Sequence, residues 1–360
     1  MTLKKYQSYL AKLFINKFIK TSLVFFCVVI LINFFEEIRF SEKHSIEIYN
    51  VFYLSILNAP SLIFEILPFI FFVSIIFFYL ELSEKNELEI FNSNGISNLK
   101  IVFLSVLITL LMGIIILLFY YTLSSNLKSL YLDAKNRFSN SNQYLAVVNN
   151  DGLWIKEEID NNLYIIHAKK LKKNKLKYLT INEVSKYYES DNTIVAESAD
   201  ILSKNWKLED VSILSKGGIT KKFKSYVYNS SFDGEIISNL FSNLNALNIY
   251  ELHNLSKNYL SIGYSNTDIK IHLNKIYSMP VFYVLMTILG FIIINKLKSI
   301  KSKFFVIIFG VLVSVIVYYL NYFSSLLGSN GVLPIYLSVW VPLLILFLIC
   351  NIGLLKINES

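Results

Sequence analysis

The sequence has little of what a soluble enzyme of its length contains. Only 17 % of its 360 residues are charged, whereas 54 % are hydrophobic, against about 25 % and 45–50 % in soluble proteins. Its two cysteines, Cys27 and Cys350, lie in apolar runs, which excludes a disulfide framework or a cysteine metal site. The four histidines are scattered, and no Walker A, nucleophile-elbow or zinc-protease pattern occurs. We therefore expect no cofactor, no metal and no enzymatic activity.

Long apolar runs are abundant instead. Crossing a bilayer takes about 20 mostly apolar residues. Six runs qualify, at about 14–35, 59–80, 99–122, 277–296, 304–327 and 332–355. No small-residue cleavage site follows the first run, so we expect a retained helix rather than a signal peptide.

The lysines orient these six spans. Five of them precede or begin the first run, and four lie between the fourth and fifth runs, at 296–303. The positive-inside rule places both segments, and hence both termini, in the cytoplasm. The net charge of +8 is thus explained by membrane orientation, and we expect no nucleic-acid partner.

Residues 126–275 form a polar insertion long enough for a domain of its own. Apolar and polar residues alternate there in short runs separated by Asn, Asp, Gly and Ser, which predicts seven or more antiparallel strands in a sandwich or jelly roll. Trp154 and Trp206 are expected to fill its core. The basic run 167–177 is either a solvated hairpin or a phosphate-attracting patch. Helical character returns at about 246–258 and 265–276.

The predicted fold is an α-helical membrane protein with six transmembrane helices and an all-β, jelly-roll-like domain between helices 3 and 4. The expected domains are 1–125 with helices 1–3, 126–275 with the β domain and a helical connector, and 276–360 with helices 4–6. Two alternatives to a transport subunit remain, a membrane-anchored scaffold or sensor and a permease for another envelope component. An intramembrane enzyme is disfavoured, because no catalytic constellation occurs in the spans.

Charged residues close the first span, in the motif Asn33-Phe34-Phe35-Glu36-Glu37-Ile38-Arg39. Glu36 and Arg39, at i and i+3, share one helical face. They are either interfacial anchors or the lining of a cavity that handles a charged head group. In the second span, Pro60 and Pro68 flank Glu65, which is either interfacial or buried in the bent helix.

A short cytoplasmic stretch, 83–97, follows the second span. Its predicted helix, at about 83–96, is ended by Gly95. The helix has apolar and acidic sides, which suits either docking into a groove of another protein or a solvated loop. Its candidate residues are Glu84, Glu87, Leu88, Ile90, Phe91 and Gly95.

Together these motifs resemble the lipopolysaccharide export permeases of the LptF/LptG type, over nearly the full length. The matching pieces are Tyr9-Leu10, NFFEEIR, PSLIFEILPF, ELSEKNELEIFNSNGIS, GLWIK, WKLEDV, LNIYELHNLSKNYLSIG and LGSNGVLP. The last hairpin leans toward the LptG-like branch.

The resemblance implies a non-catalytic permease subunit of an ABC transporter in the bacterial inner membrane. Its expected partners are a second LptF/LptG-type permease, a cytoplasmic ATPase dimer, a single-span partner of the LptC type, a periplasmic bridge protein and lipopolysaccharide. The 83–96 helix would couple to the ATPase, with Glu87 as the contacting acid. Spans one and five would be gate helices. The lipid or gate residues implied are Asn33, Glu36, Glu37, Arg39, Glu65, Tyr318 and Asn321, although Asn33 stands where some relatives have lysine.

Overall fold

The computed structural model describes residues 5–44, 46–138, 145–149, 152–159, 162–172, 175–184, 190–215, 220–234, 237, 243–261, 265–297 and 303–358. The chain divides into two compact units, which are described separately. One joins Met1–Lys128 to Ile271–Ser360, and the other is Ser129–Lys270.

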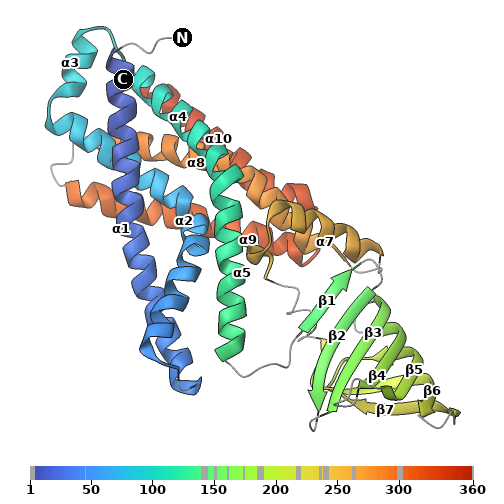
Figure 1. Cartoon of the computed structure of the whole chain (residues 1–360). Coiled ribbons are helices and arrows are strands. Elements are labelled where there is room, and N and C mark those ends of the chain that lie inside the picture. Colours follow the sequence, from blue (N-terminus) through green and yellow to red (C-terminus); the bar gives the residue numbers. More distant parts are fainter. Residues whose placement is uncertain are drawn as a thin grey trace. The chain divides into compact units, whose positions relative to one another are not determined.

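Within the described part of the chain, six helices are long and apolar enough to cross a membrane, which confirms the predicted spans (Figure 1). The third is continuous but has a π-helical turn between α4 and α5, and the short helix α3 lies before it. The bounds are α1 (Lys5–His44), α2 (Ile48–Glu84), α3 (Glu87–Ser93), α4 (Asn98–Ile115), the π turn (Ile116–Tyr120), α5 (Tyr121–Phe138), α8 (Thr267–Lys296), α9 (Lys303–Ser329) and α10 (Ile335–Asn358).

Helices α2 and α8 form the buried centre of the first unit, whereas α1, α9 and α10 expose most of their apolar length. Small residues allow the central pair to pack closely. A Cβ at Gly290 would lie 2.9 Å from the Phe72 carbonyl oxygen, so only glycine fits where α8 meets α2. Thr109 of α4 and Thr287 of α8 share a buried 3.2 Å hydrogen bond. Close backbones and paired hydroxyls therefore hold the centre together.

The second unit contains one antiparallel sheet, which confirms the predicted β domain. Its seven described strands are hydrogen-bonded in chain order and so form a meander. They are β1 (Leu145–Asn149), β2 (Gly152–Ile159), β3 (Asn162–Lys172), β4 (Lys175–Val184), β5 (Ser190–Asp200), β6 (Asn205–Ser215) and β7 (Thr220–Asn229). The helix α7 (Ile249–Ser261) follows, where helical character was predicted.

The two tryptophans of the sheet differ in environment. Trp206 is fully buried, and its indole N–H donates to the Phe232 carbonyl at 2.7 Å, as expected for a core residue. The prediction for Trp154 was wrong, because it is 37 % exposed and stacks on His167, with ring centroids 4.1 Å apart. Its neighbours Leu153 and Ile155 are buried, and alternation along the strand turns Trp154 to the other face.

A buried carboxylate holds the curled sheet. Glu157 of β2 accepts hydrogen bonds from the Tyr228 hydroxyl of β7 at 2.6 Å, the Ser230 hydroxyl at 2.9 Å and the Ser231 N–H at 3.0 Å. Since β2 and β7 are far apart in strand order, these bonds join distant parts of one sheet. Burial and the neighbouring Glu157 charge raise the pKa of Tyr228 far above its ordinary value, so the hydroxyl stays a donor.

We expect Glu157→Ala to loosen β7, because three donors lose a buried charged acceptor. Hydrogen bonds to charged groups contribute about 1.5–3 kcal/mol each, so amide exchange in 220–231 should accelerate by roughly a hundredfold. Hydrogen-exchange mass spectrometry of the full chain measures this. Glu209→Ala is the control, since Glu209 is an exposed carboxylate of β6 that accepts a hydrogen bond from Ser198. Equal exchange in the two variants would contradict the role of Glu157.

Candidate functional site

The helix predicted at about 83–96 is shorter in the structure: α2 continues to Glu84, a turn follows, and α3 covers only Glu87–Ser93. The end of α3 is well defined. The Ile96 N–H bonds to the Phe91 carbonyl at 2.9 Å, and the Gly95 N–H to the Asn92 carbonyl at 3.0 Å. These are the two bonds of a Schellman motif, which needs a left-handed residue, and Gly95 has φ +77°. Gly95 therefore ends the helix as predicted.

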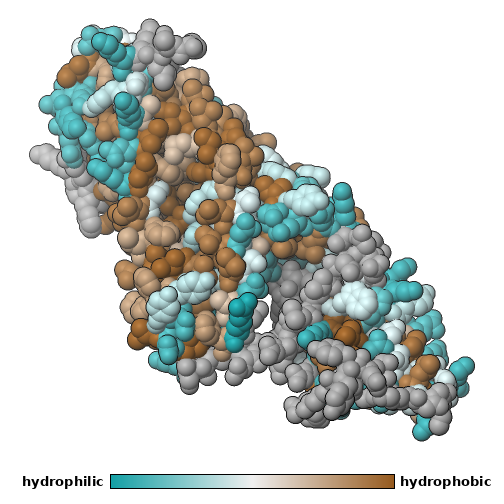
Figure 2. Space-filling model, viewed as in Figure 1, coloured by the Kyte–Doolittle hydropathy of each residue, from teal (hydrophilic) through white to brown (hydrophobic). Residues whose placement is uncertain are grey.

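The side chains of α3 divide between the bundle and the surface. Leu88 is buried and anchors the helix, whereas Ile90 is 57 % exposed. Glu89 is exposed, while Glu87 and Phe91 are half-buried. Glu84, the last residue of α2, is exposed as well. Figure 2 shows a hydrophilic surface at this end of the unit, next to the apolar flanks of the helices. An exposed isoleucine amid carboxylates is a surface that suits an apolar groove with basic edges.

Polar contacts join α1 both to α3 and to the end of α2. The Tyr9 hydroxyl of α1 lies 2.8 and 2.9 Å from the two carboxylate oxygens of Glu87. Glu81 of α2 pairs with Lys17 of α1 and with Lys85. Sequence reasoning missed these roles of Tyr9 and Lys17, because nothing local indicates which side of α1 meets α3.

Toward the other end of the helices, a buried polar chain links three of them. Lys128 donates to the Asn58 side-chain oxygen at 2.6 Å, and Asn58 donates to the Asn33 side-chain oxygen at 3.0 Å. Asn33 donates in turn to the Ser55 carbonyl at 3.1 Å. We call these four residues the polar chain. It explains a polar residue at position 33, which ties α1 to α2.

The remaining charged residues of α1 lie on two faces. Glu37, one turn after Asn33, is 1 % exposed and shares its inward face. Glu36 and Arg39 are both exposed. The structure therefore does not gather the four predicted residues of this motif into one site, but it leaves Glu36 and Arg39 accessible to a charged group.

Glu65 of α2 is half-buried and faces charged and polar groups from two other helices. Its charge is close enough to interact with Lys275 of α8 and Tyr318 of α9. The Lys275 ammonium also lies 5.6 Å from the ring centroid of Tyr322. The structure thus brings Glu65 and Tyr318 together, as two predicted site residues. Sequence reasoning missed Lys275, because it lies just before the apolar run of the fourth span.

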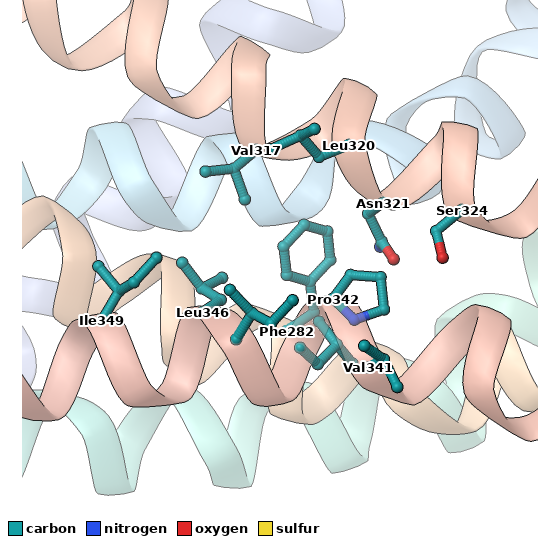
Figure 3. A pocket seen from close by; sticks show the side chains of 11 residues that line it. Phe282, Val317, Leu320, Asn321, Ser324, Val341, Pro342, Leu346 and Ile349 are labelled. Atoms are coloured by element: carbon teal, nitrogen blue, oxygen red, sulfur yellow. The ribbon is translucent and has the colours of Figure 1, made fainter.

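Asn321 is placed elsewhere. It is buried at a pocket of about 270 Å³ between α9 and α10, with Phe282 of α8 behind it (Figure 3). The predicted residues therefore fall at separate places: α3 with the end of α2, the polar chain at Asn33, the exposed Glu36 and Arg39, the polar groups at Glu65 and Tyr318, and this pocket.

These features define a polytopic membrane protein with a β domain inserted between its third and fourth spans, and with a short polar helix between the second and third. The family model described as lipopolysaccharide export system permease LptF/LptG matches residues 8–356. The chain belongs to this family, whose general role is lipopolysaccharide export. No curated protein sequence matches the chain closely enough to extend the comparison.

We expect Asn58→Leu to destabilise the helical unit, because it interrupts the polar chain where water cannot substitute. The loss of two buried hydrogen bonds, one to a charged group, should lower the unfolding free energy by about 2 kcal/mol. Thermal unfolding of the purified chain measures the shift. Asn351→Leu is the control, since Asn351 is exposed and bonds within its own helix, to Phe347. Identical midpoints for the two variants would show that the polar chain contributes no stability.

Proposed function

We propose that this chain is a permease subunit of an ABC transporter that extracts lipopolysaccharide from the inner membrane and passes it to a periplasmic bridge. The observation that carries the proposal is α3, with its exposed Ile90 and carboxylates, in a chain of this family. A short helix between two spans, anchored by one buried leucine, is suited to transmitting the motion of a bound partner.

The proposed partners are a cytoplasmic ATPase dimer on α3, a second permease of the same family, a single-span protein of the LptC type and the bridge protein. The lysines of the amino terminus and of 296–303 support a cytoplasmic location for both termini and α3. The β domain is then periplasmic. ATP hydrolysis is proposed to occur in the ATPase, and the resulting motion is proposed to move this subunit.

The contacts of α3 support a route for that motion. The Tyr9–Glu87 bond and the pairing of Lys17 with Glu81 link α3 and the end of α2 to α1. Movement of α3 is therefore proposed to move α1, one of the expected gate helices.

The charged groups at the other end support contact with a lipid head group. Glu36 and Arg39 are exposed on α1, and Arg39 is the candidate partner of a phosphate. Glu65, Lys275 and Tyr318 form a polar cluster on α2, α8 and α9, which a sugar or phosphate could contact. Charged residues within spans are costly, so their presence favours a functional role.

The test of the proposal is co-purification with the ATPase of the same export system. Glu87→Arg reverses the charge of the proposed contact, and we expect it to lower recovery of the ATPase at least tenfold, since like charges at an interface cost several kcal/mol. Glu42→Arg is the matched control, because it makes the same charge change on an exposed carboxylate near the end of α1 that lies far from α3.

A second control separates docking from the bond to α1. Tyr9→Phe removes the hydroxyl that Glu87 holds but keeps the carboxylate, so the ATPase should still co-purify. Recovery from the Glu87→Arg variant equal to that of the wild type would sink the coupling role of α3 and favour a scaffold or sensor.

A further inference from the structure

The pocket between α9 and α10 has two polar residues in an otherwise apolar wall. Figure 3 shows Asn321 and Ser324 at one end and Ile349 at the other. The remaining lining residues carry hydrocarbon side chains. From Val341 to Ile349 the pocket follows α10 for roughly 12 Å, at 1.5 Å per residue. It therefore has a polar end and an apolar body.

Ser324 is accounted for by helix geometry. Pro342 has no N–H, so the Ser338 carbonyl one turn earlier lacks its helical donor. The Ser324 hydroxyl donates to that carbonyl at 2.8 Å. The Ser324 hydroxyl therefore supplies the hydrogen bond that the Ser338 carbonyl of α10 lacks, and this contact already uses its proton.

Asn321 is not accounted for in this way. Its side chain is only 6 % exposed, and its carbonyl oxygen Oδ1 has no hydrogen-bond partner among the described residues. A buried amide without a partner costs roughly 1–3 kcal/mol in a protein. In a bilayer, water is scarce as a replacement. A ligand that donates one hydrogen bond at this end of the pocket would remove the cost.

The rim of the pocket indicates where that ligand comes from. Leu320, Ile345 and Ile349 are each more than half exposed and flank it with apolar surface. They lie on membrane-spanning helices, so the entrance meets hydrocarbon rather than water. An α-helix about 10 Å across is too wide for a cavity of 270 Å³, whereas one hydrocarbon chain is narrow enough.

We propose that this pocket binds a single acyl chain that carries a hydroxyl or amide N–H near its polar end, donated to the Asn321 Oδ1. The inference rests on the proposed lipid-handling function and adds a site on the α9–α10 face to it. The chain belongs either to the transported lipid or to a resident bilayer lipid.

The test compares two photoreactive probes of equal length, 3-hydroxytetradecanoic acid and tetradecanoic acid, each with a diazirine near its methyl end. They are crosslinked to the full-length chain in detergent, and labelled peptides are mapped by mass spectrometry. We expect labelling within 317–349 to favour the hydroxylated probe about fivefold, which is what one hydrogen bond of about 1 kcal/mol gives.

Asn321→Leu keeps the size of the side chain and removes its carbonyl, so both probes should label equally, at the level of the plain acid. Asn351→Leu, on the exposed side of α10, should keep the preference. Leu346→Trp fills the apolar body and should abolish labelling by both probes. The two changes act at opposite ends of the pocket, so a folding failure of one leaves the other informative.

Equal labelling by the two probes in the wild type, or a preference that survives Asn321→Leu, would overturn the proposal. Native mass spectrometry of the chain purified from membranes separates the sources, because the mass of the retained lipid identifies it as lipopolysaccharide or as a bilayer lipid. A lipid with a hydroxylated or amide-linked chain that is lost from Asn321→Leu supports the proposal, and a retained lipid without such a donor contradicts it. Co-purification of the ATPase is scored independently. If the acyl-chain proposal is wrong, co-purification of the ATPase is unaffected. If the coupling proposal is wrong, the preference for the hydroxylated probe is unaffected.

Discussion

A bilayer supplies no hydrogen-bond partner to a group inside its hydrocarbon layer, and the arrangement of the spans follows from that constraint. Several buried polar side chains on these helices are paired across helix boundaries. The polar chain runs from Lys128 through Asn58 to Asn33 and joins three helices by side-chain bonds of 2.6 and 3.0 Å. The Ser324 hydroxyl donates to the Ser338 carbonyl, which Pro342 leaves without its helical donor. Because each pair fixes one helix against another, polarity determines the register of the bundle, while apolar packing fills the space between.

The helices of this unit also differ in how firmly they are held. Helices α2 and α8 are buried and locked by the glycine contact at Gly290, so displacing either one breaks packing on all sides. Helix α1 has polar anchors near both ends, at Tyr9 and at Asn33. These anchors are separated by roughly 36 Å along the helix. A single rigid helix therefore connects the surface of α3 with the polar groups around Asn33, which is what a coupled gate requires.

Much of the architecture could be predicted, because spans and strands depend on local composition. The split of Glu36 and Arg39 from Asn33 and Glu37 follows helical periodicity, but the sequence does not say which face turns inward. Trp154 is flanked by the buried Leu153 and Ile155. Three apolar residues in a row leave the parity of a strand undetermined, and that is why the expectation failed there. Glu65 interacts with Lys275, and Glu87 with Tyr9. Both partners lie far away along the sequence, and local sequence patterns contain no information about such pairs.

The apolar interior of the β unit bears on the cost that a lipid would meet in the proposed function. Its interior is filled by its own apolar side chains, among them Trp206 and Phe232. In the proposed function, an acyl chain that enters exchanges one apolar contact for another, which is nearly neutral. Crossing water instead would cost about 0.8 kcal/mol for each exposed methylene. Because Glu157 joins β2 to β7 over this interior, opening the sheet there requires breaking charged hydrogen bonds as well as separating apolar side chains.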